Sequence, residues 1–127
     1  MQSREDVEKL EKLIGQLQGL HAEIGTLAKK SPNDAVNAFK LKLVNKVIEM
    51  GNDVLGENYK PFDEFDQFNS DDAPSTSDVT MVIAQYMEEA ERFRSDNVML
   101  EHGLWKYVVN GEASDIRSGH PSKIVKK

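Results

Sequence analysis

A single stripe of mostly apolar side chains runs from Val79 to Tyr107, in steps that alternate between four and three residues. This alternation is the period of helices that pack in a coiled coil. We therefore predict one long helix here, opened by the capping-box variant at residues 75–78. The stripe consists of Val79, Ile83, Tyr86, Ala90, Phe93, Asn97, Leu100, Leu104 and Tyr107.

Two further helices are predicted before this stripe. A capping sequence at residues 3–6 precedes apolar positions that recur every three or four residues from Val7. A second start signal at residues 31–34 combines Ser, Pro, Asn and Asp, and the helix that follows is predicted to end at Leu55, before Gly56. Because the link between these helices is short, we expect them to be antiparallel neighbours.

The third helix is predicted to be long enough to project beyond the other two. An exposed remainder of its stripe would favour a second copy of the chain, and Asn97 occupies a position where a buried Asn can fix helix register. We therefore predict an all-α fold, an antiparallel helical hairpin plus one long third helix, associating as a helical-bundle dimer. The predicted oligomerisation residues are Ile83, Tyr86, Ala90, Phe93, Asn97, Leu100 and Leu104.

The helical pattern ends after Val109. A turn signal follows at residues 110–111, and the rest of the chain is polar with a basic end, which predicts a flexible tail. A small hairpin at this turn is the alternative, although the alternation beyond it is poor. The predicted organisation is one helical domain over residues 1–110, with a connection at 56–76, and a tail over 111–127.

The charge of the chain is concentrated in residues 57–78, which overlap this connection and which we call the acidic segment. It holds seven acidic residues and one basic residue, a balance of −6, and the whole chain also has a net charge of −6. The acidic and basic residues in the rest of the chain are therefore equal in number. A long connection inside a compact domain is uncommon unless it is functional or disordered. The acidic segment is therefore the first place to look for a binding surface.

Aromatic side chains are interleaved with these acids. Tyr59 is followed by three Phe residues at every third position, so one helical turn would place the rings on one side and the carboxylates on the others. The rings could fold back over the helices, or they could anchor a basic protein partner that the carboxylates attract. The predicted partner-binding residues are Tyr59, Phe62, Asp63, Glu64, Phe65, Asp66 and Phe68.

Composition excludes several classes of function. The chain has no cysteine, which rules out disulfide scaffolds and thiolate sites and is compatible with a reducing cytosol. Residues 1–30 lack the pattern of a signal peptide, and no stretch approaches the roughly 20 apolar residues of a membrane span. The pI near 5.1 argues against binding to the nucleic-acid backbone. We expect a cytoplasmic protein with no membrane contact and no nucleic-acid partner.

The sequence carries no catalytic signature. None of His21, His102 and His120 follows a Glu by three residues, as a di-iron helical bundle requires, and no stretch has the ligand spacing of an EF-hand. Helical magnesium-dependent pyrophosphohydrolases use a Glu-Glu-x-x-Glu pattern. Residues 88–91 approach it, but Arg92 stands where the last carboxylate is needed. We expect neither a metal nor a cofactor.

These observations favour a non-catalytic binding or adaptor protein that recognises a basic protein partner through residues 57–78. The first alternative is a protein that binds a small molecule or nucleotide at a subunit interface, through Trp105, Tyr107 or the basic tail. The second alternative is the magnesium-dependent hydrolase, with Glu88 and Glu91 as the residues to test.

Overall fold

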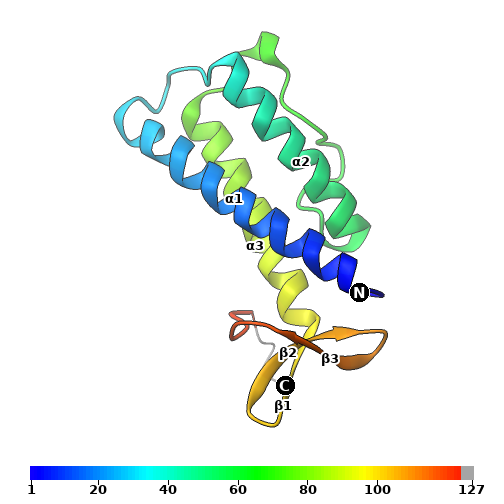
Figure 1. Ribbon diagram of the computed structural model, residues 1–127. Helices are drawn as coiled ribbons and strands as arrows, with labels where there is room; N and C mark the ends of the chain where they lie inside the picture. The colour runs from blue at the N-terminus through cyan, green and yellow to red at the C-terminus, as the bar shows by residue number, and fades with distance from the viewer. Residues whose placement is uncertain (124–127) are drawn as a thin grey trace.

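The computed structural model describes residues 1–123 and contains three helices followed by a small antiparallel sheet (Figure 1). The predictions of an all-α fold, a helical bundle and a coiled coil are therefore wrong, because the chain is mixed α and β. In chain order the elements are α1 (Arg4–Lys30), α2 (Ala38–Tyr59), the short 3₁₀ helix η1 (Ser70–Asp72), α3 (Thr76–Asp96), β1 (Val98–Glu101), β2 (Leu104–Val109) and β3 (Glu112–Arg117).

Each helix begins where a side chain accepts a hydrogen bond from a free backbone N–H group. Ser3 caps α1 through the N–H of Asp6 at 3.2 Å, and Ser75 caps α3 through the N–H of Asp78 at 3.1 Å. The cap of α2 is Asn37, so this helix begins later than the start signal at residues 31–34 suggested. These four residues instead belong to a connection that is hydrogen-bonded to the start of α3.

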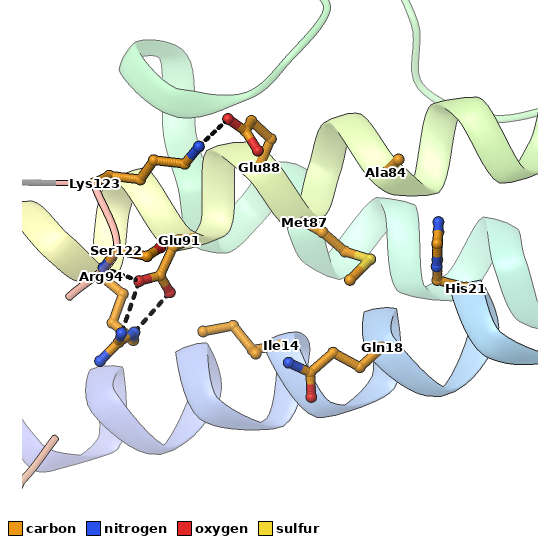
Figure 2. Close-up of a pocket in the computed structure, with 10 residues that line it drawn as sticks. All are labelled: Ile14, Gln18, His21, Ala84, Met87, Glu88, Glu91, Arg94, Ser122 and Lys123. Carbon is orange, nitrogen blue, oxygen red and sulfur yellow. Dashed lines mark hydrogen bonds and ion pairs between the residues drawn. The ribbon is translucent and has the colours of Figure 1, made fainter. Parts of the chain in front are cut away.

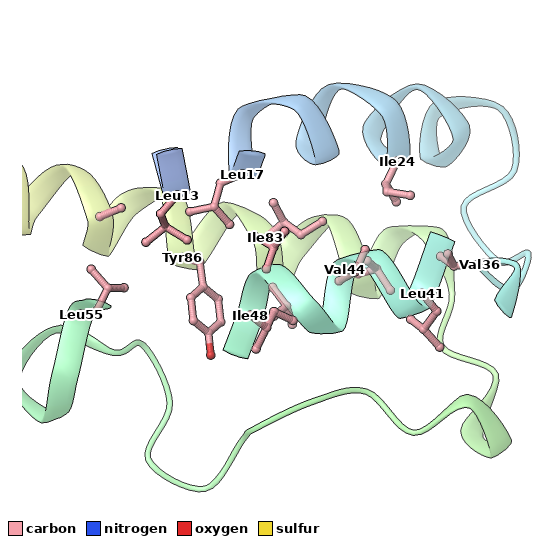
Figure 3. Close-up of a cluster of buried hydrophobic side chains, with 14 residues drawn as sticks. Leu13, Leu17, Ile24, Val36, Leu41, Val44, Ile48, Leu55, Ile83 and Tyr86 are labelled. Carbon is pink, nitrogen blue, oxygen red and sulfur yellow. The ribbon is translucent and has the colours of Figure 1, made fainter. Parts of the chain in front are cut away.

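The three helices share one apolar core, and α1 lies antiparallel to α2 (Figures 1 and 3). The regular stripe of α3 faces this core as far as Ala90, which is fully buried. Burial of a Val, Leu or Ile side chain contributes about 1.5–3 kcal/mol. The buried side chains that hold the helices together include Leu13, Leu17 and Ile24 of α1, Leu41, Val44, Ile48 and Leu55 of α2, and Val79, Ile83 and Tyr86 of α3.

Helix α3 ends at Asp96 rather than continuing to Tyr107. Asn97 leaves the helical conformation, and its side-chain amide donates to the carbonyl of Phe93 at 2.8 Å, which satisfies one of the free carbonyl groups at the helix end. The chain then forms β1, β2 and β3, joined by two-residue turns at 102–103 and 110–111. All four turn residues have positive φ, as in the tight turns that fit the twist of a hairpin.

The sheet is attached to the beginning of α1. Tyr107 of β2 is buried against Val7 and Leu10 of α1, and Ile116 of β3 packs on the same cluster. The predicted tail at 111–127 thus includes β3, whose residues belong to the sheet. Residues 124–127 of that tail lie outside the described part of the chain.

Candidate functional site

The acidic segment begins in the last turn of α2, runs back along the helices and ends in the first turn of α3 (Figures 1 and 3). Asn45 of α2 holds its middle. The Asn45 side chain donates to the carbonyl of Phe68 at 2.9 Å and accepts from the N–H of Phe68 at 2.8 Å. The amide thus pairs with both backbone groups of one residue, as a neighbouring strand would. This pairing fixes an irregular segment on the surface of α2.

The phenylalanine rings of the segment form a chain of edge-to-face contacts on the core. Phe62 lies 6.4 Å from Tyr86 of α3 and 6.0 Å from Phe65, and Phe65 lies 5.0 Å from Phe68, measured between ring centroids. All three Phe side chains are half-buried. Each of these ring pairs adds about 0.5–1.5 kcal/mol beyond simple burial. The rings therefore both cover the core and leave part of their surface accessible.

Tyr59 belongs to a separate contact at the end of α2. Its ring packs edge-to-face on Phe93 with the centroids 4.9 Å apart, and its hydroxyl donates to Asp96 at 2.5 Å. This hydrogen bond, with a smaller effect of burial, raises the pKa of Tyr59 to about 12. Tyr59 thus links the ends of α2 and α3, apart from the chain of phenylalanine rings.

The carboxylates of the segment face away from the core. Asp63, Glu64 and Asp66 are exposed, and within residues 1–123 none of the three forms an ion pair or a side-chain hydrogen bond. The nearby cation, Lys60, is paired with Glu57 at 3.0 Å. That hydrogen bond raises the pKa of Lys60, and the charges of Asp63 and Asp66 raise it further. The segment therefore presents exposed negative charge, although Asp66 also shares a surface hollow with Lys42 and Lys46 of α2.

An apolar hollow opens beside Glu64. Its volume is about 360 Å³. Met81 on its wall is 58% exposed, although most large apolar side chains of the helices are covered. Asp78 lies one turn before Met81 on α3 and is also exposed. The hollow is lined by Phe62, Glu64, Phe65, Met81 and Val82.

The predicted oligomerisation residues are divided between two environments. Ile83, Tyr86 and Ala90 are fully buried inside the protomer, and the Tyr86 hydroxyl donates to Asn52 at 2.7 Å. Contact between copies through these three side chains would require the helices to separate. The other four positions are less buried: Phe93 and Asn97 are half-buried at the end of α3, and Leu100 and Leu104 are exposed on β1 and β2.

A larger groove lies between α1 and α3 (Figure 2). Its volume is about 570 Å³, and Ile14, Ala84 and Met87 form its apolar part. His21 lies at one end, and Lys123 lies at the other, where it is ion-paired with Glu88. The groove is therefore bounded partly by the chain that follows β3.

Glu91 and Arg94 of α3 hold that chain in place. Arg94 donates to both carboxylate oxygens of Glu91, at 2.7 and 2.8 Å, and also to the carbonyls of Gly119 and His120. The N–H of Ser122 donates to Glu91 at 3.1 Å. Burial alone would raise the pKa of Glu91, but the hydrogen bonds from Arg94 and Ser122 outweigh it and lower the pKa to about 2.

The acidic residues of the magnesium-hydrolase pattern are engaged with cations. Glu88 pairs with Lys123, Glu89 with Arg92 and Glu91 with Arg94. His120 lies against Trp105, with the ring centroids 5.4 Å apart. In the part of the chain that the structure describes, no cluster of three or more His, Asp or Glu side chains is arranged to hold a metal ion.

Comparison of the chain with protein-family models, with curated proteins and with solved structures gives no match. Among residues 1–123, no helix combines the length and the apolar character needed to cross a bilayer. The hollow beside Glu64, which we call the acid-rimmed hollow, and the groove between α1 and α3 are two candidate sites with apolar walls.

Sequence reasoning did not find three residues that shape the hollow and its surroundings. Met81 and Val82 belong to α3, and the expected site was restricted to the preceding connection. The Asn45 contact joins residues 23 positions apart. A signal for Met81 was present, because it is a large apolar residue outside the stripe of α3. An apolar side chain on the polar face of a helix indicates a contact that the helix period does not explain.

Proposed function

We propose that the protein is a non-catalytic binding protein that recognises a basic protein partner through the acid-rimmed hollow. The observation that carries this proposal is the combination of an almost wholly apolar hollow with the exposed, unpaired carboxylate of Glu64 on its wall. Asp63 precedes Glu64 in the chain, and Asp78 lies one helical turn before Met81, and both are exposed. Protein interfaces obtain most of their affinity from a few apolar or aromatic anchors in a desolvated centre. Charges at the rim mainly increase the rate of association and select the partner.

The chemistry of the hollow indicates what the partner presents. An apolar side chain would enter between Phe62, Phe65 and Met81, and Lys or Arg residues beside it would meet Asp63, Glu64 and Asp78. Met81 is unbranched and flexible, so it can adapt to anchors of different shape. The partner segment is therefore basic and amphipathic. We place this activity in the cytoplasm as part of the same proposal, because the cysteine-free composition suits a reducing compartment.

The proposal is tested with a lysine-rich peptide that carries one Phe, and with a matched peptide that carries Ala instead. We expect the protein to bind the first peptide at least tenfold more tightly. The double substitution Asp63→Lys and Glu64→Lys, or Met81→Lys alone, should weaken binding at least tenfold. The control is Asp71→Lys with Asp72→Lys, which makes the same charge change at η1, outside the hollow.

Two results would count against the proposal. Equal affinity for the Phe and Ala peptides would show that binding is only a charge attraction. Equal weakening by the two double substitutions would show that the hollow is not the site. Circular dichroism of each variant checks that the helices are intact, so a loss of binding can be assigned to the surface.

The groove between α1 and α3 supports a second candidate function, the binding of a small molecule. Its volume of about 570 Å³ is within the range of ligand sites, and Ala84 lies on its wall. Thermal unfolding against a panel of metabolites and nucleotides tests this function, because a bound ligand stabilises the folded state. A shift seen with one compound should disappear in Ala84→Phe, which would fill the groove. No shift with any compound leaves only the peptide-binding proposal.

A further inference from the structure

Exposed apolar side chains are concentrated on the hairpin of β1 and β2. Six large apolar residues of the described chain are exposed, and three of them lie here: Met99 at 39%, Leu100 at 55% and Leu104 at 37%. The hairpin extends beyond the end of α3, away from the helices (Figure 1). Met99 and Leu104 lie on one face of this hairpin and Leu100 lies on the other, so exposed apolar side chains occur on both faces.

The outer edge of β1 also has free backbone groups. β1 is at one end of the sheet order β1-β2-β3. Glu101 is opposite Leu104 across a two-residue turn, and the carbonyl of Asn97 accepts from the N–H of Val108 at 2.7 Å. Residues 97, 99 and 101 therefore direct their hydrogen-bonding groups towards β2, because these groups alternate along an antiparallel strand. The N–H and carbonyl groups of Val98 and Leu100 consequently point outward.

The two edges of the sheet are protected to different extents. β3 carries the exposed charged residues Glu112, Asp115 and Arg117, and its pairing with β2 has an irregularity in register. Charges and bulges are the usual means by which proteins prevent a strand edge from pairing. β1 has a single charged residue, Glu101, and this is ion-paired with Lys106 of β2 at 2.9 Å. The β1 edge thus lacks the protection that the β3 edge has.

We propose that the β1 edge pairs with β1 of a second copy of the chain, antiparallel and about a two-fold axis at Met99. In this register Val98 faces Leu100 of the other copy, and all four outward groups of each strand are paired. A shift that puts Leu100 on the axis would set Met99 against Glu101 and leave Val98 opposite the turn residue His102. A shift that puts Val98 on the axis would require Asp96, which is still in α3. The four-residue strand is therefore complementary to itself in one register.

This pairing would join two three-stranded sheets into one of six strands. The sequence had predicted a different dimer, formed through the apolar stripe of α3. The pairing proposed here uses Leu100 of β1, and Ile83, Tyr86 and Ala90 stay buried in the core of each protomer. A short strand makes a small interface, so we expect the dimer to dissociate on dilution. The pairing does not depend on the peptide-binding proposal. Where both hold, the dimer presents two hollows and could bind a bivalent partner.

Single cysteines test the register, because the natural chain contains no cysteine. Directly opposed residues that are not hydrogen-bonded have Cα atoms about 4.5 Å apart, within disulfide range. Met99→Cys should therefore form a covalent dimer rapidly under mild oxidation. Leu100→Cys is the matched control, because the two copies of Leu100 would be diagonal neighbours about 7–8 Å apart, too far for an unstrained disulfide.

Analytical ultracentrifugation measures the reversible association. We expect the mass of the wild-type protein to approach twice that of the protomer as its concentration rises, and Leu100→Lys to remain monomeric. Phe39→Lys, a similar change at a 72% exposed position on α2, should associate as the wild type does. Three results would overturn the proposal: a monomer at every concentration up to millimolar, a dimer that persists in Leu100→Lys, or equal cross-linking of Met99→Cys and Leu100→Cys.

Discussion

Gly51 tests how closely α2 approaches α3, because a single added methyl group would meet the ring of Tyr86. A Cβ atom at Gly51 would lie 3.0 Å from Cδ1 and 3.2 Å from Cε1 of that ring, and 3.6 Å from a methyl group of Leu13. Tyr86 is fully buried, and its hydroxyl is fixed by the hydrogen bond to Asn52. The ring therefore has little room to move away.

Two opposing contributions decide the effect of Gly51→Ala. Replacing Gly by Ala inside a helix stabilises the folded state by about 1 kcal/mol. Forcing a methyl group into a packed core costs about 1–3 kcal/mol. We expect a net loss of about 1 kcal/mol in the free energy of unfolding. Gly15→Ala is the matched control, since Gly15 is an exposed residue of α1 with no atom within 4 Å of an added Cβ. It should stabilise the protein by up to about 1 kcal/mol.

Urea unfolding followed by circular dichroism measures both changes, with the slope of the transition confirming that the amount of exposed surface is unchanged. The difference between the two variants removes the common helix-propensity contribution and isolates the steric cost at Tyr86. A Gly51→Ala variant as stable as Gly15→Ala would refute the close approach of α2 and α3. It would show either that the helices are further apart or that the ring of Tyr86 is free to move.

Two predictions concern titration. Glu91→Gln should lower the free energy of unfolding at neutral pH by about 1–2 kcal/mol after allowance for solvent screening, because Arg94 holds the pKa of this carboxyl at about 2. A carboxyl whose pKa is lowered on folding stabilises the fold fully above its ordinary pKa of 4.5, and this stabilisation is lost as the pH falls towards 2. The unfolding free energies of the wild-type protein and Glu91→Gln should therefore converge towards pH 2. A difference that stays constant with pH would contradict the ion pair of Glu91 with Arg94. The pKa of all three tyrosines is raised, mainly by a hydrogen bond to a carboxylate at Tyr59 and by burial at Tyr86 and Tyr107. Tyrosinate absorbance should therefore show no step near pH 10 while the protein remains folded, and stability should fall above that pH; a full step with an intact fold would contradict the structure.

The beginnings of α1 and α3 could be read from the sequence because their signals are local. Ser3 and Ser75 each accept a hydrogen bond from an N–H group three residues later, so the evidence for the cap is contained in four residues. Burial follows the helix period as far as Ala90 for a similar reason, since every third or fourth side chain must share a face. Such regularities do not depend on the rest of the fold.

The shape of the candidate site could not be read in the same way. The hollow joins Phe62 and Phe65 of the acidic segment to Met81 of α3, and its position depends on how Asn45 fixes the backbone at Phe68. The spacing of the phenylalanines indicates that the rings share one side. It does not indicate which helix that side meets, because the contact is between residues distant in sequence.

The end of α3 was predicted wrongly because a hairpin can imitate the helix period. Leu100 and Leu104 are four residues apart, as the stripe requires, but they lie on two strands on either side of a turn. The overlooked signal is the pair His102-Gly103, whose φ angles are +51° and +78°. A dipeptide that accepts positive φ at both positions favours a tight hairpin turn. Asn110-Gly111 repeats this signal after β2.

The substitution Gly103→Ala distinguishes the helix from the hairpin by the sign of its effect. In a continuous helix, Ala in place of Gly would stabilise the protein by about 1 kcal/mol. In the hairpin, Ala would have to adopt a φ of +78°, which should cost about 1 kcal/mol or more. Gly119→Ala is the control, because Gly119 is exposed, has no positive φ and has no atom near an added Cβ. Thermal unfolding followed by the fluorescence of Trp105, the single tryptophan, places the measurement on β2 itself. A higher melting temperature for Gly103→Ala than for the wild-type protein would mean that the helix extends through this position and that the sheet, with its β1 edge, does not form.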